Sequence, residues 1–187
     1  MNQDSGFGTN GVPYEYTVSE AKSFSLTMRR ILLILLYVAW CVGFFMAGVI
    51  TKLAVPMIAI VPLTLWVVVL FTWRLTQVEY EYSYFSGELT VSRVLGGRTR
   101  RVLTKITLRN LAAVYPCDEP YLPHIEAFGA QKETFAASGE GAEDLFAALW
   151  TDEQDVRHVM YFEPTEKALR ILKYYNRSAV VARTVAR

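Results

Sequence analysis

Two apolar segments decide the fold: Ile31–Ile50 (ILLILLYVAWCVGFFMAGVI) and Leu53–Trp73 (LAVPMIAIVPLTLWVVVLFTW), separated by Thr51 and Lys52. Neither segment contains a charged residue. Each holds about 20 residues, and a helix of that length, rising about 1.5 Å per residue, spans the roughly 30 Å hydrocarbon core of a bilayer. We therefore predict a two-helix transmembrane hairpin over residues 31–73.

Two other classes of protein carry apolar segments of this kind. A buried helical hairpin of a soluble protein normally keeps a polar stripe on each helix, which the first segment lacks. A cleaved signal peptide has an apolar core of about 7–15 residues, shorter than Ile31–Ile50, and does not lead straight into a second apolar segment. Insertion of either segment is favourable by several kcal/mol, at roughly −0.5 kcal/mol for each Leu, Ile, Phe or Val. We therefore favour an integral membrane protein.

The charges that flank the segments predict the orientation in the membrane. Lys22, Arg29 and Arg30 precede the first segment and Arg74 follows the second, whereas the link carries only Lys52. Because basic residues concentrate on the cytoplasmic side, we predict a multi-pass protein of the cell membrane with both termini in the cytoplasm. The spans contain no Asp, Glu, Lys, Arg or His, which argues against a transporter acting alone.

The residues before the first span divide into two parts. Residues 1–13 are rich in Gly and polar side chains, a composition typical of disorder. Residues 14–30 are mildly amphipathic, with Val18 and Met28 among the apolar positions at near-helical spacing. We expect a juxtamembrane helix there, which either lies on the inner membrane surface or simply extends the first span.

After the second span the apolar pattern changes to a period of two, which is typical of half-buried strands. Tight turns are expected at Ser86-Gly87 and Gly96-Gly97. Strict alternation places Val102 and Ile106 on one face of the third strand. A helix is expected from Thr165, which can cap it, to Tyr175. The strands are expected at about 78–85, 88–95, 101–109, 111–116, 132–137, 144–151 and 156–162.

Seven strands followed by one helix are the order of elements in a pleckstrin-homology-like (PH-like) barrel. The expected fold class is therefore an α+β membrane protein. Its transmembrane hairpin precedes a partly open, seven-stranded β-barrel that a C-terminal helix caps. This cytoplasmic domain is assigned to residues 77–176 and is followed by a basic tail, residues 177–187. The alternative is a generic β-sandwich with a peripheral helix.

Four short motifs carry a resemblance to a known family: Glu79-Tyr80-Glu81-Tyr82, Gly87-Glu88-Leu89-Thr90-Val91, Arg98-Thr99-Arg100-Arg101 and Phe162-Glu163-Pro164-Thr165-Glu166-Lys167. The chain resembles a family of small two-helix membrane proteins of Gram-positive bacteria with a bacterial PH-like domain, a domain of unknown function. The resemblance implies the fold and the membrane location, and it supplies no activity.

The basic residues gather in one stretch. Between Arg93 and Arg109 the chain has six basic residues and no acidic one. Near a membrane, each basic side chain gains about 1 kcal/mol from anionic headgroups. The candidate contacts with anionic lipid or with a partner are Arg98, Arg100, Arg101 and Lys105. The alternative is a solvated strand face that pairs with the domain's own acids.

The sequence offers little for catalysis. It has no nucleophile elbow, HExxH or dinucleotide fingerprint, and His124 and His158 stand apart from any Cys pair, so we expect no catalytic site, metal or cofactor. A net charge of +1 argues against nucleic-acid binding. No pattern establishes a homo-oligomer. We expect a non-enzymatic, membrane-anchored module that binds a protein partner or the anionic membrane surface. The alternative is an accessory subunit of a transporter or membrane enzyme, bound through the hairpin.

Overall fold

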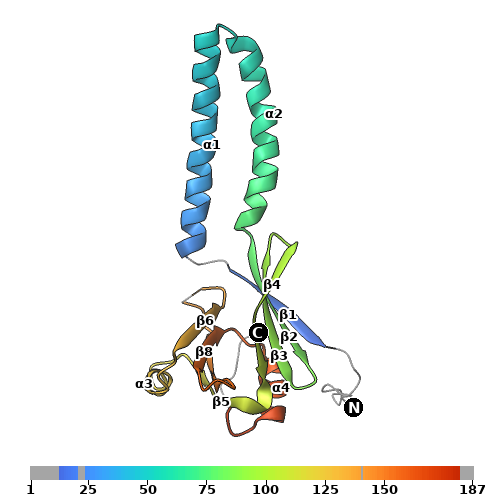
Figure 1. The fold of residues 1–187 in the computed structure, drawn as a ribbon, viewed down its shortest axis with the longest axis vertical. Coiled ribbons are helices and arrows are strands. Elements are labelled where there is room, and N and C mark those ends of the chain that lie inside the picture. The colour runs from blue at the N-terminus through green and yellow to red at the C-terminus, as the bar shows by residue number, and fades with distance from the viewer. Residues whose placement is uncertain (1–12, 21–23, 140, 182–187) are drawn as a thin grey trace.

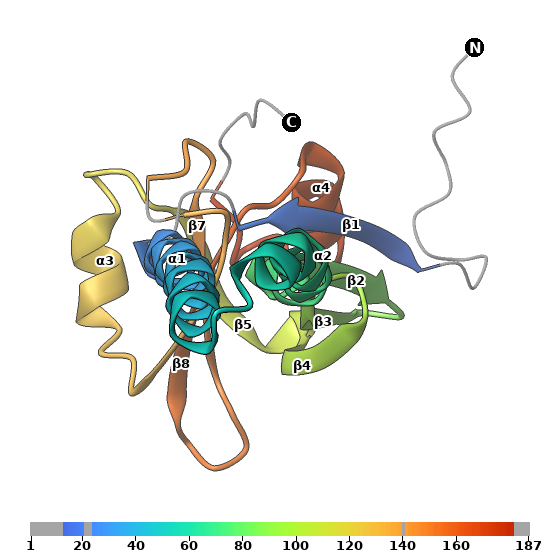
Figure 2. The same cartoon turned by 90° about the horizontal axis from the view of Figure 1, so that it is seen from above.

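The computed structural model describes residues 13–20, 24–139 and 141–181 of the chain. Two long antiparallel helices stand on a domain of strands and short helices (Figure 1). Seen from above, the two long helices lie side by side over the middle of the domain (Figure 2). Residues 1–12 of the segment predicted to be disordered, 1–13, and residues 182–187 of the predicted basic tail lie outside the described residues.

The long helices are α1 (Phe24–Thr51) and α2 (Ala54–Thr72), joined at Lys52, whose φ is +60°. Within the described residues one stretch, Thr27–Thr51 of α1, is long and apolar enough to cross a membrane, and little of it is buried by the rest of the protein. The apolar part of α2, Ala59–Thr72, is shorter. Polar contacts also join the two helices, because the Tyr37 hydroxyl hydrogen-bonds the Thr72 hydroxyl.

Four strands form the first sheet, in the order β1-β2-β3-β4 and antiparallel throughout: β1 (Tyr14–Ser19), β2 (Val78–Phe85), β3 (Glu88–Leu95) and β4 (Thr99–Thr107). β1 precedes the helical hairpin, and β2 follows it after a 3₁₀ turn, η1 (Trp73–Thr76). The two long helices are therefore an insertion between neighbouring strands of one sheet.

The structure corrects the amphipathic helix predicted for residues 14–30. Tyr14, Tyr16 and Val18 recur with a period of two and lie opposite Tyr84, Tyr82 and Tyr80 of β2. The partner strand carries the same alternation, so pairing buries both apolar faces together, and the helix begins only at Phe24. The domain assigned to residues 77–176 thus takes its first strand from before the helices.

The second sheet has the order β5-β7-β8-β6, with β6 parallel to β8. Val180 adds an isolated parallel bridge to β5. The seven strands after the helices begin and end within two residues of the predicted positions, but they lie in two sheets that do not close into the predicted barrel. A short helix, α3, lies between the strands predicted at 111–116 and 132–137. The elements are η2 (Leu108–Asn110), β5 (Leu111–Pro116), α3 (Leu122–Ala127), β6 (Lys132–Ala136), β7 (Phe146–Thr151) and β8 (Arg157–Phe162).

The closing helix, α4 (Glu166–Tyr175), forms as predicted. The Thr165 hydroxyl caps it by accepting from the Ala168 backbone N–H. Its apolar face, with Leu169 and Leu172, is buried in a core that residues of both sheets share. The helix therefore fills the space between the sheets.

A β-bulge corrects the alternation predicted for β4. The register with β3 shifts between Val91 and Ser92, so Val102 turns away from the core. Val102 is 50% exposed, whereas Ile106, beyond the bulge, is 2% exposed. Period-two reasoning fails here because one extra residue reverses every later side chain.

The insertion predicts that the helices can be removed if β1 is kept. Glu20 and Val78 already share a backbone hydrogen bond (Glu20 N to Val78 O, 2.9 Å), so an Asn-Gly turn in place of residues 21–77 should close the hairpin. We expect a soluble, cooperatively folded protein in urea titrations. A fragment that begins at Gln77 lacks β1 and should be less stable by several kcal/mol, at about 1.5–3 kcal/mol for each large apolar side chain left uncovered. Equal stability of the two proteins would show that β1 is peripheral.

Candidate functional site

The candidate site is the end of the first sheet beside the long helices, which we call the helix–sheet junction. There η1 packs against α1, α2 and β3. The turn between β3 and β4 is fixed to the same place, because the Gly96 N–H donates to the Gln77 carbonyl at 2.8 Å, one residue beyond η1. The tip of the β3–β4 hairpin therefore lies close to the base of α2 (Figure 1).

The structure brings three of the four predicted basic residues to the junction. Arg98 lies in the β3–β4 turn, and Arg100 and Arg101 follow at the start of β4; all three are exposed. Lys105 lies opposite Thr90, beyond the bulge. At roughly 3.3 Å per residue, it is about 13 Å further along the strand than Arg101. Lys105 therefore does not belong to the junction.

Arg100 differs from its neighbours because it has an acidic partner. Its Nη2 lies 2.6 Å from Glu81 Oε1, with side-chain exposures of 61% for Arg100 and 11% for Glu81. The expectation of a strand face that pairs with the domain's own acids thus holds at Arg100. Arg98 and Arg101 make no ion pair with any residue that the structure describes, so their charges are available to a ligand.

A buried polar cluster also lies at the junction, and sequence reasoning missed it. Glu20 is 7% exposed. Its Oε2 accepts a hydrogen bond from the Tyr80 hydroxyl at 3.2 Å and lies 3.7 Å from Arg93 Nη2. Burial, followed by the charge of Glu20, raises the pKa of Tyr80 to about 12. Tyr80 therefore stays protonated and remains a donor. The signal was in the sequence, since Glu20 continues the alternation of Tyr14, Tyr16 and Val18 along β1.

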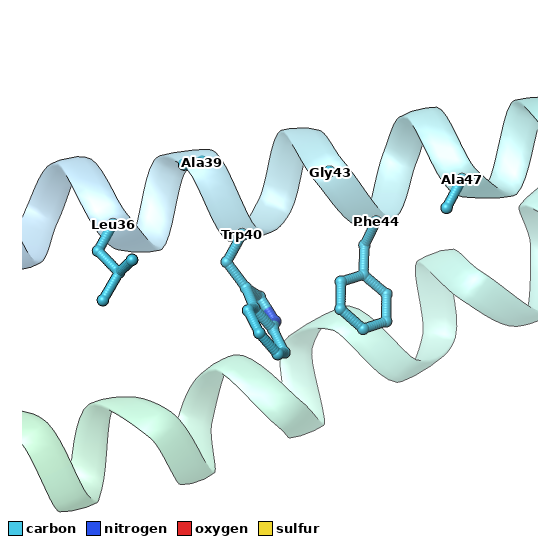
Figure 3. Close-up of a pocket in the computed structure, with 6 residues that line it drawn as sticks. All are labelled: Leu36, Ala39, Trp40, Gly43, Phe44 and Ala47. Carbon is cyan, nitrogen blue, oxygen red and sulfur yellow. The ribbon is translucent and has the colours of Figure 1, made fainter.

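A groove with a volume of about 460 Å³ lies along helix α1. The residues that line it all come from α1: Leu36, Ala39, Trp40, Gly43, Phe44 and Ala47. Trp40 and Phe44 point toward α2 (Figure 3). A β-carbon added at Gly43 would meet no atom within 4 Å. The groove offers apolar and aromatic surface with little to hold a charged ligand.

The described residues contain no group of three or more His, Cys, Asp and Glu side chains that could hold a metal ion. His158 stacks on Trp150 and lies 2.9 Å from Asp152, whose carboxylate also accepts from the backbone of the β7–β8 turn. These contacts stabilise the β7–β8 turn. Burial raises the pKa of Cys117 to about 11, so its thiol is a poor nucleophile at neutral pH.

Comparison with known families identifies the domain. The family described as Bacterial PH-like domain (DUF6106) matches residues 11–182. The chain belongs to this family. The match includes β1, both long helices and every later element, so the insertion lies within the family's own extent. The family is of unknown function. No curated protein and no solved structure matches the chain at a significant level.

The buried polar cluster predicts that neutralising Glu20 costs more folding stability than neutralising an exposed acid of the same strand. Glu20→Gln leaves Arg93 without a counter-charge in a partly buried site, so it should lower the free energy of unfolding by about 1–3 kcal/mol. Glu15→Gln, an exposed change on the same strand, should cost less than about 0.5 kcal/mol. Thermal unfolding of the full chain in detergent compares the two. Equal effects would mean that the buried pair contributes nothing.

Proposed function

We propose that the protein is a non-enzymatic, membrane-anchored PH-like module whose helix–sheet junction contacts anionic lipid headgroups. α1 and α2 form its transmembrane hairpin. α1 has 28 residues and α2 has 19, and about 17–25 apolar residues are needed to cross a bilayer. Large apolar side chains, such as Leu32, Val55 and Phe71, are exposed along both helices. Soluble monomers rarely expose so much contiguous apolar surface, which supports lipid as the surrounding medium.

The charges on the helices support a cytoplasmic domain. Arg29 and Arg30 lie at the end of α1 beside the domain, and Arg74 lies in η1, whereas Lys52 lies at the far turn. The domain side of the helices thus carries more basic residues than the opposite side. The positive-inside rule therefore assigns the domain side to the cytoplasm.

One observation carries the proposed contact with lipid: the hydrogen bond from Gly96 to Gln77. It holds the β3–β4 turn next to the residue at which the chain leaves α2 and η1. If α2 spans the bilayer, Arg98 and Arg101 lie at the level of the headgroups without any movement of the domain. Each such side chain is worth about 1 kcal/mol against an anionic leaflet.

The groove on α1 favours a second candidate, an accessory subunit that binds a larger membrane protein through the hairpin. Ala39, Gly43 and Ala47 leave room at four-residue intervals, and small residues at this spacing let a further helix approach closely in a bilayer. Gly43→Leu, which fills the open space, should separate the candidates. It should abolish co-purification of a membrane partner and leave the lipid contact unchanged.

The lipid contact predicts protection of one turn. In nanodiscs with about 30% phosphatidylglycerol, amide hydrogen exchange at Gly97–Thr99 should slow relative to pure phosphatidylcholine. The difference should shrink at about 0.5 M salt, where the screening length is only about 4 Å. The double change Arg98→Gln and Arg101→Gln should remove it. The β2–β3 turn at Ser86-Gly87, at the opposite end of the sheet, is the internal control. Equal exchange in both lipids at low salt would refute the contact.

The proposed topology predicts a pattern of thiol labelling. Because Cys117 is half-buried with a raised pKa, its silence toward a reagent would not report its location. New cysteines belong at exposed positions, Thr51 in the α1–α2 link and Gln154 in the β7–β8 turn, with both native cysteines changed to Ser. In intact cells a membrane-impermeant maleimide should label Thr51→Cys at once and Gln154→Cys only after permeabilisation. The reverse pattern would invert the topology.

A further inference from the structure

Two arginines face each other across β3 and β4 at the helix–sheet junction. Arg93 and Arg101 are direct cross-strand partners, so their side chains leave the same face of the sheet. The β-carbons of such partners lie about 4.5–5.5 Å apart, and like charges at that distance destabilise a sheet. An anion between the two side chains would relieve this repulsion.

The protein's own carboxylate, Glu20, fills that role only in part, because it forms an ion pair with Arg93 but no hydrogen bond. Glu20 lies 3.7 Å from Arg93 Nη2, too far for a hydrogen bond, and its Oε2 is already engaged by Tyr80. The guanidinium of Arg93 makes no hydrogen bond to any residue that the structure describes, and its Nε is buried without a partner. Buried donors without an acceptor are rare in native proteins.

The surroundings add positive charge. The charge of Arg29, on α1, acts on Tyr80 and lowers its pKa, opposing the effects of burial and of Glu20. Arg29 lies in the first two turns of α1, at the end of that helix beside the domain. Arg30, the next residue of α1, also has a buried Nε without a partner. Arg93 thus lies opposite Tyr80 and beside the carboxylate of Glu20, and Arg101 lies next to Arg93 on the following strand.

We propose that Arg93 and Arg101 together bind the phosphomonoester headgroup of an anionic phospholipid, with Arg29 adding positive charge nearby. A phosphomonoester carries about −1.5 to −2 charge near neutral pH and offers three acceptor oxygens, which complements the excess of cations over Glu20. Guanidinium groups pair with phosphate through two parallel hydrogen bonds. The lipid is favoured as the source because Arg29 belongs to α1 itself and the cluster lies where that helix meets the domain. The proposal rests on the membrane anchoring argued above and adds a specific ligand class to the junction.

Lipid retention by the full chain tests the proposal. The protein, in nanodiscs of phosphatidylcholine, receives phosphatidic acid or phosphatidylglycerol at matched surface charge, and bound lipid is counted by native mass spectrometry. Phosphatidic acid should bind at least about tenfold more tightly, since one charge-assisted hydrogen bond is worth about that factor. Equal retention of the two lipids would overturn the phosphomonoester site. Protection of the β3–β4 turn in phosphatidylglycerol would then still support the broader lipid contact, so the two proposals fail separately.

Variants separate ligand binding from support of the fold. Arg101→Gln changes an exposed residue and should lower phosphatidic acid retention about tenfold. Arg93→Lys keeps the positive charge beside Glu20 but loses Nε and the planar fork, so it should weaken retention at an unchanged unfolding temperature. Lys105→Gln, further along β4, is the matched control and should bind as the unchanged protein does. Unaltered binding by both arginine variants would overturn the site.

A separate experiment distinguishes a lipid phosphate from a soluble one. Inorganic phosphate, added to the protein in phosphatidylcholine nanodiscs at constant ionic strength, should raise the unfolding temperature less than the same bulk concentration of phosphatidic acid. Stabilisation by inorganic phosphate equal to that by the lipid, and lost in Arg101→Gln, would assign the site to a soluble phosphate and overturn the lipid as its source.

Discussion

The pairing of β1 with β2 is the constraint on which the rest of the structure depends. It joins residues on either side of an inserted pair of helices, from Tyr14 opposite Tyr84 to Ser19 opposite Glu79. The tyrosines of β1 also reach the last helix: the Tyr14 hydroxyl bonds that of Thr165, and Tyr16 donates to the Glu163 carbonyl. One short strand therefore connects the first sheet, the long helices and α4.

The arrangement of charged residues at the helix–sheet junction follows from the pairing of β1 with β2. Because β1 ends and β2 begins there, Glu20, Tyr80 and Arg93 converge from three different strands or their ends. The same geometry brings the β3–β4 turn beside η1 through the hydrogen bond of Gly96. A patch that looks like one basic run in the sequence is thereby divided. Arg98 and Arg101 stay available at the junction, Arg100 is neutralised by Glu81, and Lys105 lies further along the strand.

Local patterns predict most of this fold, and long-range pairing explains what they miss. Each strand after the helices shows its own alternation and turn residues, and Thr165 marks the start of α4, so these elements were predictable from the sequence. β1 was not predictable, because its partner strand lies beyond both apolar segments. A segment of six residues is also too short to distinguish the helical period of 3.6 from the strand period of two. The bulge in β4 contains no Gly that would have indicated it in the sequence. The role of Glu20 became clear only once β1 was known to pair with β2. Arg98 and Arg101 were found by charge alone.

The insertion of the helices between paired strands also sets an order of events during synthesis. β1 leaves the ribosome before α1, whereas β2 is completed only after both helices have been made. The residues of the first sheet's initial strand must therefore wait, unpaired, until the hairpin is in place. Contacts between distant residues form late and slowly in folding. Completion of the first sheet would then report that both helices had been made, and a chain in which β1 and β2 failed to meet would keep an open sheet edge and remain visible to proteases and chaperones.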